Sequence, residues 1–121
     1  MKIKWQKALP ELMEFFEKST AGIDCEHRKM FGYPCCFFNG NMFAGVFKDA
    51  IIIRLSEPDR TQTLARYKGT ARFEPLPGRV MKEYVTLPEK IFRDEKILEE
   101  LLMKSVKYVA KLPKKEKKKR K

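Results

Sequence analysis

The sequence predicts an α+β fold, a two-layer sandwich of one antiparallel sheet with helices packed mainly on one of its faces. Three observations lead to this prediction. Apolar residues recur at helical spacing near both ends of the chain, residues 23–55 alternate with a period of two, and turn residues separate the alternating runs. With 121 residues, 43% of them apolar, the chain can build one packed core. We expect one domain over residues 1–112 and a disordered basic tail over residues 113–121.

An N-terminal helix is predicted by five apolar residues on one helical face, Trp5, Leu9, Leu12, Met13 and Phe16. Pro10 leaves two alternatives, because proline fits the first turn of a helix and breaks its interior. Either the helix begins near Leu9, or the residues before Pro10 form a separate turn kinked onto it. Lys18 in the last turn and Gly22 after it mark the end of the helix.

Three or four antiparallel strands in sequential order are expected over residues 23–55. Gly32-Tyr33-Pro34 interrupts the first alternating run. Asn39-Gly40 is a strong hairpin signal, because both residues tolerate the positive φ angles of a type I′ turn. Lys48-Asp49-Ala50 marks the next turn, before the β-branched run that ends at Leu55.

A short helix is expected to begin at Ser56 or Asp59, whose side chains can cap it, and to end toward Gly69. Two extended segments follow at residues 71–75 and 79–87, joined by a proline-rich turn that excludes helix.

The last helix opens at Asp94 and closes at Pro113. Its apolar stripe, which we expect to pack on the sheet, consists of Leu98, Leu101, Leu102, Ser105, Val109 and Leu112.

Four short motifs occur in a fixed order along the chain. They are Arg28-Lys-Met-Phe-Gly32, Gly40-Asn-Met-Phe-Ala44 followed by Val46, Arg54-Leu55, and Met81-Lys-Glu-Tyr-Val-Thr-Leu-Pro88. Together they resemble the TfoX (Sxy) N-terminal domain family. The most specific parts are the Met-Phe-Gly turn and the Tyr-x-x-Leu-Pro strand exit, so the residues matched to family positions with structural roles are Met30, Phe31, Gly32, Gly40, Tyr84 and Pro88.

The resemblance implies a fold similar to type III secretion chaperones, with the element order α-β3-α-β2-α. Full-length members of the family regulate natural competence and carry a second, C-terminal helical domain, where this chain has the sequence PKKEKKKRK. No set of catalytic residues is established for the family, so the resemblance implies a fold and a regulatory role without an active site.

Four residues offer metal-ligand or nucleophile chemistry: Cys25, His27, Cys35 and Cys36. Adjacent residues of an extended strand point to opposite faces, so Cys35 and Cys36 are not expected to bind one ion. A Cys-His nucleophile also needs a third group that orients the base. We therefore predict thiols that fill the core, with no metal, no cofactor and no catalytic residue. A thiol- or metal-dependent enzyme is the less favoured alternative.

The aromatic residues Phe37, Phe38, Phe43 and Phe47, with basic residues around them, allow two interpretations. They form a stacking platform for single-stranded nucleic acid, or they divide between the core and a face hidden by association. We favour a non-catalytic binding or regulatory module that acts through a protein partner or as a homodimer. A nucleic-acid-associated protein is the alternative.

More than half of the net charge of +11 lies in the tail, which carries +6. Its candidate contacts to nucleic acid or other anions, nonspecific and weakened by salt, are Lys114, Lys115, Lys117, Lys118, Lys119, Arg120 and Lys121. No apolar run reaches the ~18–20 residues that span a bilayer, so membrane insertion is not expected. The lack of an export signal and the odd number of cysteines, three, predict a cytoplasmic protein with reduced thiols.

Overall fold

The computed structural model describes residues 3–30 and 32–113. Along the chain the elements are α1 (Ile3–Thr20), β1 (Glu26–Met30), β2 (Tyr33–Phe38), β3 (Asn41–Phe47), β4 (Ala50–Arg54), α2 (Glu57–Arg66), β5 (Ala71–Leu76), β6 (Arg79–Leu87), α3 (Glu89–Phe92) and α4 (Glu95–Ala110). Within the described ranges, no helix combines the length and the apolar character needed to cross a bilayer.

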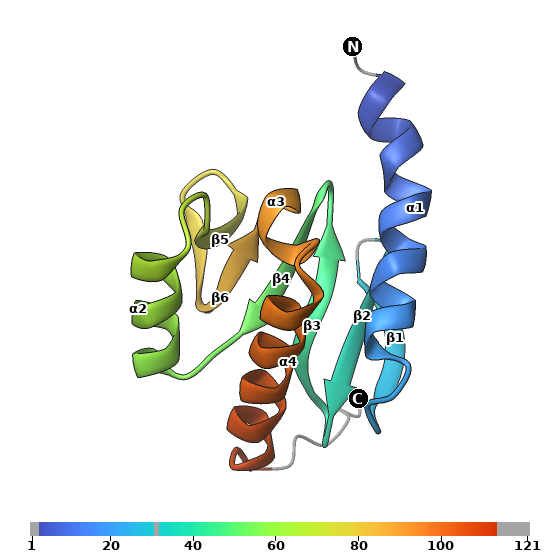
Figure 1. The fold of residues 1–121 in the computed structure, drawn as a ribbon. Coiled ribbons are helices and arrows are strands. Elements are labelled where there is room, and N and C mark those ends of the chain that lie inside the picture. The colour runs from blue at the N-terminus through green and yellow to red at the C-terminus, as the bar shows by residue number, and fades with distance from the viewer. Residues whose placement is uncertain (1–2, 31, 114–121) are drawn as a thin grey trace.

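The six strands form one antiparallel sheet in the order β1-β2-β3-β4-β6-β5, with α1 and α4 lying across it (Figure 1). The predicted α+β fold class is confirmed. The structure has four strands before α2 where the family order has three, because the turn at Gly32 separates β1 from β2. It also adds the short helix α3 ahead of α4.

Local turn and cap signals place the elements as the sequence predicts. Asn39 and Gly40 have φ angles of 54° and 80° and join β2 to β3. Ser56 accepts a hydrogen bond from the backbone N–H of Asp59 and caps α2. The Asp94 carboxylate accepts from the N–H groups of two residues in the first turn of α4, at 3.1 and 3.3 Å.

The N-terminal helix is continuous. It runs through Pro10, so neither alternative that this proline left open is realised. Leu12 and Phe16, in the part that follows the proline, are buried against the sheet and hold the helix in place.

The larger core lies between the sheet and the helices. It contains Phe16 from α1, Ile51 and Ile53 from β4, and the α4 residues Leu98, Leu101, Leu102 and Val109. The predicted stripe of α4 is thus confirmed, apart from Leu112, which is only partly buried.

A second, smaller core lies on the opposite side of the sheet. It consists of Cys35, Met42, Ile52, Phe73 and Tyr84. Neighbours along a strand alternate between the two cores, as Ile51, Ile52 and Ile53 do. Phe43 is an exception. The β2–β3 register shifts between Cys36 and Phe37, which leaves Phe43 as a bulge and places it in the helix-side core next to Ala44.

Candidate functional site

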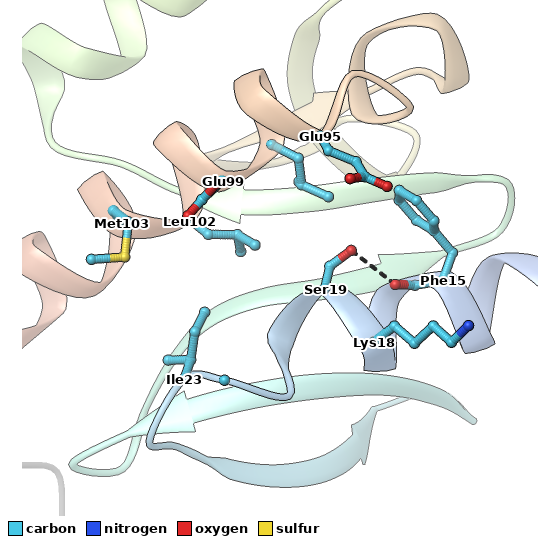
Figure 2. A pocket seen from close by; sticks show the side chains of 10 residues that line it. Phe15, Lys18, Ser19, Ile23, Glu95, Glu99, Leu102 and Met103 are labelled. Atoms are coloured by element: carbon cyan, nitrogen blue, oxygen red, sulfur yellow. Dashed lines mark hydrogen bonds between the residues drawn. The ribbon is translucent and has the colours of Figure 1, made fainter.

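A groove of about 390 Å³ separates α1 from α4 on the helix-covered side of the sheet (Figure 2). Phe15 and Ile23 line it from the α1 side, and Leu98, Leu102 and Met103 line it from α4. Leu98 and Leu102 are buried, whereas 51% of Met103 is exposed. The groove therefore has an apolar floor and one large apolar side chain in contact with solvent.

The rims of this groove carry opposite charges. Lys18 lies on α1, and Glu95 and Glu99 lie on α4 (Figure 2). All three residues are exposed. The Ser19 hydroxyl donates a hydrogen bond to the Phe15 carbonyl oxygen at 2.9 Å, so this donor is already engaged within α1.

Three of the four metal-ligand residues come together at the start of the β1–β2 hairpin. The ligand atoms of Cys25, His27 and Cys36 all lie within 4.8 Å of one another. Cys25 Sγ lies 4.0 Å from His27 Nε2, and the buried Thr20 Oγ1 lies 3.4 Å from the same nitrogen. His27 and Cys36 are directly paired across β1 and β2, a relationship that depends on strand register and is not visible in the spacing of the sequence.

Cys35 points to the other side of the sheet. It belongs to the smaller core, and its thiol donates to the Arg28 carbonyl oxygen at 3.5 Å. The expectation that Cys35 and Cys36 face opposite ways is confirmed.

The thiols are protonated in this arrangement at neutral pH. Burial raises the pKa of Cys36 to about 12 and also raises the pKa values of Cys25 and Cys35. A reactive cysteine needs a lowered pKa, because the thiolate is the nucleophile.

The aromatic residues of the proposed stacking platform do not share one face. Phe43 is fully buried in the helix-side core, and Phe38 packs against the same core. Phe37 and Phe47 lie on the opposite side, half-buried. There Arg28 lies 4.5 Å from the centre of the Phe37 ring and Lys48 lies 5.5 Å from the centre of the Phe47 ring. Cations thus occupy ring faces that bases would need.

The residues matched to family positions have structural roles where they are described. Gly32 and Gly40 have φ angles of 82° and 80° in turns. Tyr84 is buried, and its hydroxyl donates to the Met42 carbonyl oxygen at 3.1 Å. Pro88 precedes α3 as its N-cap.

Part of the predicted residue set lies outside the described structure. Met30 ends β1, but only its backbone is described. Phe31 and the tail residues 114–121 lie outside the described residues.

A family model described as the TfoX N-terminal domain matches residues 20–109. The matched segment runs from the last residue of α1 to the last turn of α4, so it contains the whole sheet and all three cysteines. No curated protein matches the chain.

Proposed function

Because this chain belongs to the TfoX N-terminal domain family, we propose that it works as a small regulatory and binding module through protein–protein contacts. The contact site in this proposal is the groove between α1 and α4, and its occupant is a second copy of the chain. The observation that carries the proposal is the charge pattern of the groove, with Lys18 on one rim and Glu95 and Glu99 on the other.

A two-fold symmetric dimer needs a self-complementary surface, because the same patch of each copy forms both sides of the interface. Opposite charges on the two rims meet this requirement. When two copies meet groove to groove, Lys18 of each copy meets Glu95 and Glu99 of the partner.

Apolar contact supplies the attraction between the copies. Met103 is half exposed at the groove, and Phe15 and Ile23 are only partly buried. Covering these side chains removes apolar surface from water, at about 25 cal/mol per Å². The charged rims then set the orientation of the two copies and contribute less to the affinity.

The size of the groove limits the strength of this dimer. Ten residues line it, whereas a stable interface has about 20–30 residues on each side. The helix surfaces that flank the groove have to contribute the rest. We therefore expect a weak dimer, with a dissociation constant of ~1–100 μM, that forms as the concentration rises.

Sedimentation velocity over a concentration series tests the proposal. Lys18→Glu and Glu99→Lys should each weaken the dimer about tenfold or more, because each places like charges together. The Lys18→Glu, Glu99→Lys double variant should recover part of the lost affinity, since the opposite pairing between positions 18 and 99 returns while Glu95 stays acidic. Lys68→Glu, at an exposed lysine outside the groove, is the matched control and should dimerise as the unchanged chain does.

Two outcomes contradict the groove dimer. If the chain stays monomeric at all concentrations, a second copy does not occupy the groove. A dimer that persists in both single charge variants and in Met103→Glu places the interface elsewhere.

We also propose that the module is non-catalytic. The raised pKa values of the three thiols and the 4.0 Å separation of Cys25 Sγ from His27 Nε2 support this, since neither favours a thiolate paired with a base. The odd number of cysteines supports a cytoplasmic location.

A nucleic-acid-associated role is the second candidate. The net charge of +11 supports it. In this role the tail supplies most of the attraction. Binding to a random single-stranded oligonucleotide should then fall steeply between low and moderate salt and should weaken when residues 113–121 are deleted. An absence of binding at low salt removes this candidate.

A further inference from the structure

We propose that Cys25, His27 and Cys36 form a binding site for one Zn²⁺ ion, with the two sulfurs and Nε2 as ligands. This inference is independent of the groove dimer. It rests on three ligand side chains, two thiols and one imidazole, that the fold brings together. Cys25 comes from the segment before β1, His27 from β1 and Cys36 from β2.

The distances suit a tetrahedral ion. With Zn–S bonds of about 2.3 Å and Zn–N bonds of about 2.0–2.1 Å, neighbouring ligand atoms of a zinc site lie about 3.6–3.8 Å apart. Here Cys25 Sγ and His27 Nε2 are 4.0 Å apart, and all three ligand atoms lie within 4.8 Å of one another. Side-chain rotations that move the ligand atoms by about 1 Å close this difference.

The surroundings hold the ligands in position. The direct pairing of His27 with Cys36 fixes these two residues on neighbouring strands. The thiols of Cys25 and Cys36 hydrogen-bond to each other, and Thr20 contacts both Cys36 and the His27 ring. Since the ligands already converge, binding needs little reorganisation.

One ligand of the site is buried, and the other two are accessible to solvent. Cys36 is fully buried, Cys25 is partly buried and His27 is exposed. An ion can therefore enter past His27 and Cys25 and reach the sulfur of Cys36. A buried ligand and an entry path are both expected of a genuine site.

Charge and protons balance on binding. The two thiols lose their protons to solvent and bind as thiolates, and the neutral imidazole binds through Nε2. The 2+ charge of zinc and the two thiolates sum to zero, so a neutral group remains beside the core. Three protein ligands leave a fourth position for water or an external ligand.

Zinc at this position would link the edge strand β1 to its neighbour β2. Cys25 and His27 belong to the segment that enters and forms the edge strand β1, and Cys36 belongs to the inner neighbour β2. The ion adds a second link between these segments beyond their hydrogen bonds. The thermal unfolding midpoint should therefore rise with the concentration of free Zn²⁺.

The test uses the full chain, kept reduced, and titrates it with Co²⁺ as a spectroscopic probe and then with Zn²⁺. The expected result is one equivalent of Co²⁺ with a thiolate-to-cobalt charge-transfer band and the intense visible bands of a tetrahedral ion, both lost when Zn²⁺ displaces cobalt. Cys25→Ser and His27→Ala should each weaken binding more than ~100-fold, because loss of even an outer-shell partner costs 10–100-fold. Both changes lie at positions that are not fully buried, so the variants should stay folded.

Cys35→Ala is the matched control, because it removes a thiol of the same hairpin that points away from the site. It should keep the cobalt spectrum and the affinity of the unchanged chain. The proposal is overturned if reduced protein shows no thiolate–cobalt band, if Cys25→Ser or His27→Ala binds as tightly as Cys35→Ala, or if Zn²⁺ leaves the unfolding midpoint of the unchanged chain where it was.

Discussion

The ring of Phe73 on β5 lies 5.1 Å from the ring of Phe47 on β3, although β4 and β6 separate their strands in the sheet. In a flat sheet, strands three positions apart are about 14 Å apart. The β5–β6 end must therefore curl back over the side of the sheet that faces away from the helices. The register between β5 and β6 shifts on both sides of Phe73, and such irregularities bend strands. In the part of the chain that the structure describes, the smaller core is closed in this way without a second layer of helices.

Phe73→Ala should lower the free energy of unfolding by about 3–5 kcal/mol, since it empties a buried aromatic position of the smaller core. Leu76→Ala on the same strand is the control. Leu76 is 59% exposed, so its loss should change stability by less than about 0.5 kcal/mol. Urea denaturation of both variants measures the difference. Equal effects at the two positions would show that β5 does not cover the sheet.

Local signals made most of the fold predictable. The Asn39-Gly40 turn and the caps at Ser56 and Asp94 depend on a few adjacent residues, and each is where the sequence predicts it. The curl that brings Phe73 to Phe47 coincides with register shifts between β5 and β6, for which the sequence has no periodic signature. It was therefore not predicted.

The candidate sites were less predictable than the fold, because they depend on relationships between distant elements. The contact of Cys36 with Cys25 and His27 follows from the register of β1 against β2, which the spacing of these residues in the sequence does not reveal, so this cluster was not predicted. The groove exists because α1 and α4 lie apart on one face of the sheet, and no motif encodes that separation.

Gly45→Ala should destabilise the protein by about 1–3 kcal/mol, as overpacking in a core does. Gly45 pairs with Cys35, and a Cβ at Gly45 would lie 2.9 Å from the Cβ of Cys35 and 3.3 Å from the Pro34 carbonyl oxygen. Gly22→Ala is the control, because a Cβ there has no neighbour within 4 Å among the described residues and the φ angle is not positive. Its stability should be unchanged or raised by about 0.4–1 kcal/mol. Thermal unfolding distinguishes the two, and an unaffected Gly45→Ala would contradict the register.

Ser105→Ala should cost about 1–3 kcal/mol, the penalty for leaving buried polar groups unsatisfied. The Ser105 hydroxyl lies in the apolar stripe of α4, where it is 2.9 Å from the Phe43 carbonyl oxygen and 2.5 Å from that of Arg54. Phe43 is the bulged residue of β3, so the serine supplies a donor where the strand ladder is interrupted. Urea denaturation measures the loss. A fully stable alanine variant would show that these carbonyl groups find other donors.

Glu83 and Arg54 predict a pH dependence of stability. Burial alone would raise the pKa of Glu83. The hydrogen bond from Arg54 Nε at 2.7 Å and the charge of Arg54 outweigh it, with help from Tyr108 and Arg60, and lower that pKa. A carboxyl group whose pKa is lower in the folded state than in the unfolded state stabilises the protein at pH values above its unfolded-state pKa, about 4.3 for Glu. This stabilisation is lost as the pH falls through the pKa of the folded state.

Glu83→Gln should therefore reduce the free energy of unfolding by about 0.5–1 kcal/mol at pH 7, a magnitude suited to a partly exposed ion pair. The gap between the variant and the unchanged chain should narrow as the pH falls below about 4, where the carboxyl of the unchanged chain becomes protonated. Glu89→Gln is the control, because the side chains of Glu89 and its partner Arg93 are 63% and 68% exposed, and it should have little effect at any pH. Urea denaturation from pH 3 to pH 7 measures both variants. A gap for Glu83→Gln that stays constant or widens toward acid would mean that Arg54 does not hold this carboxylate in its ionised form.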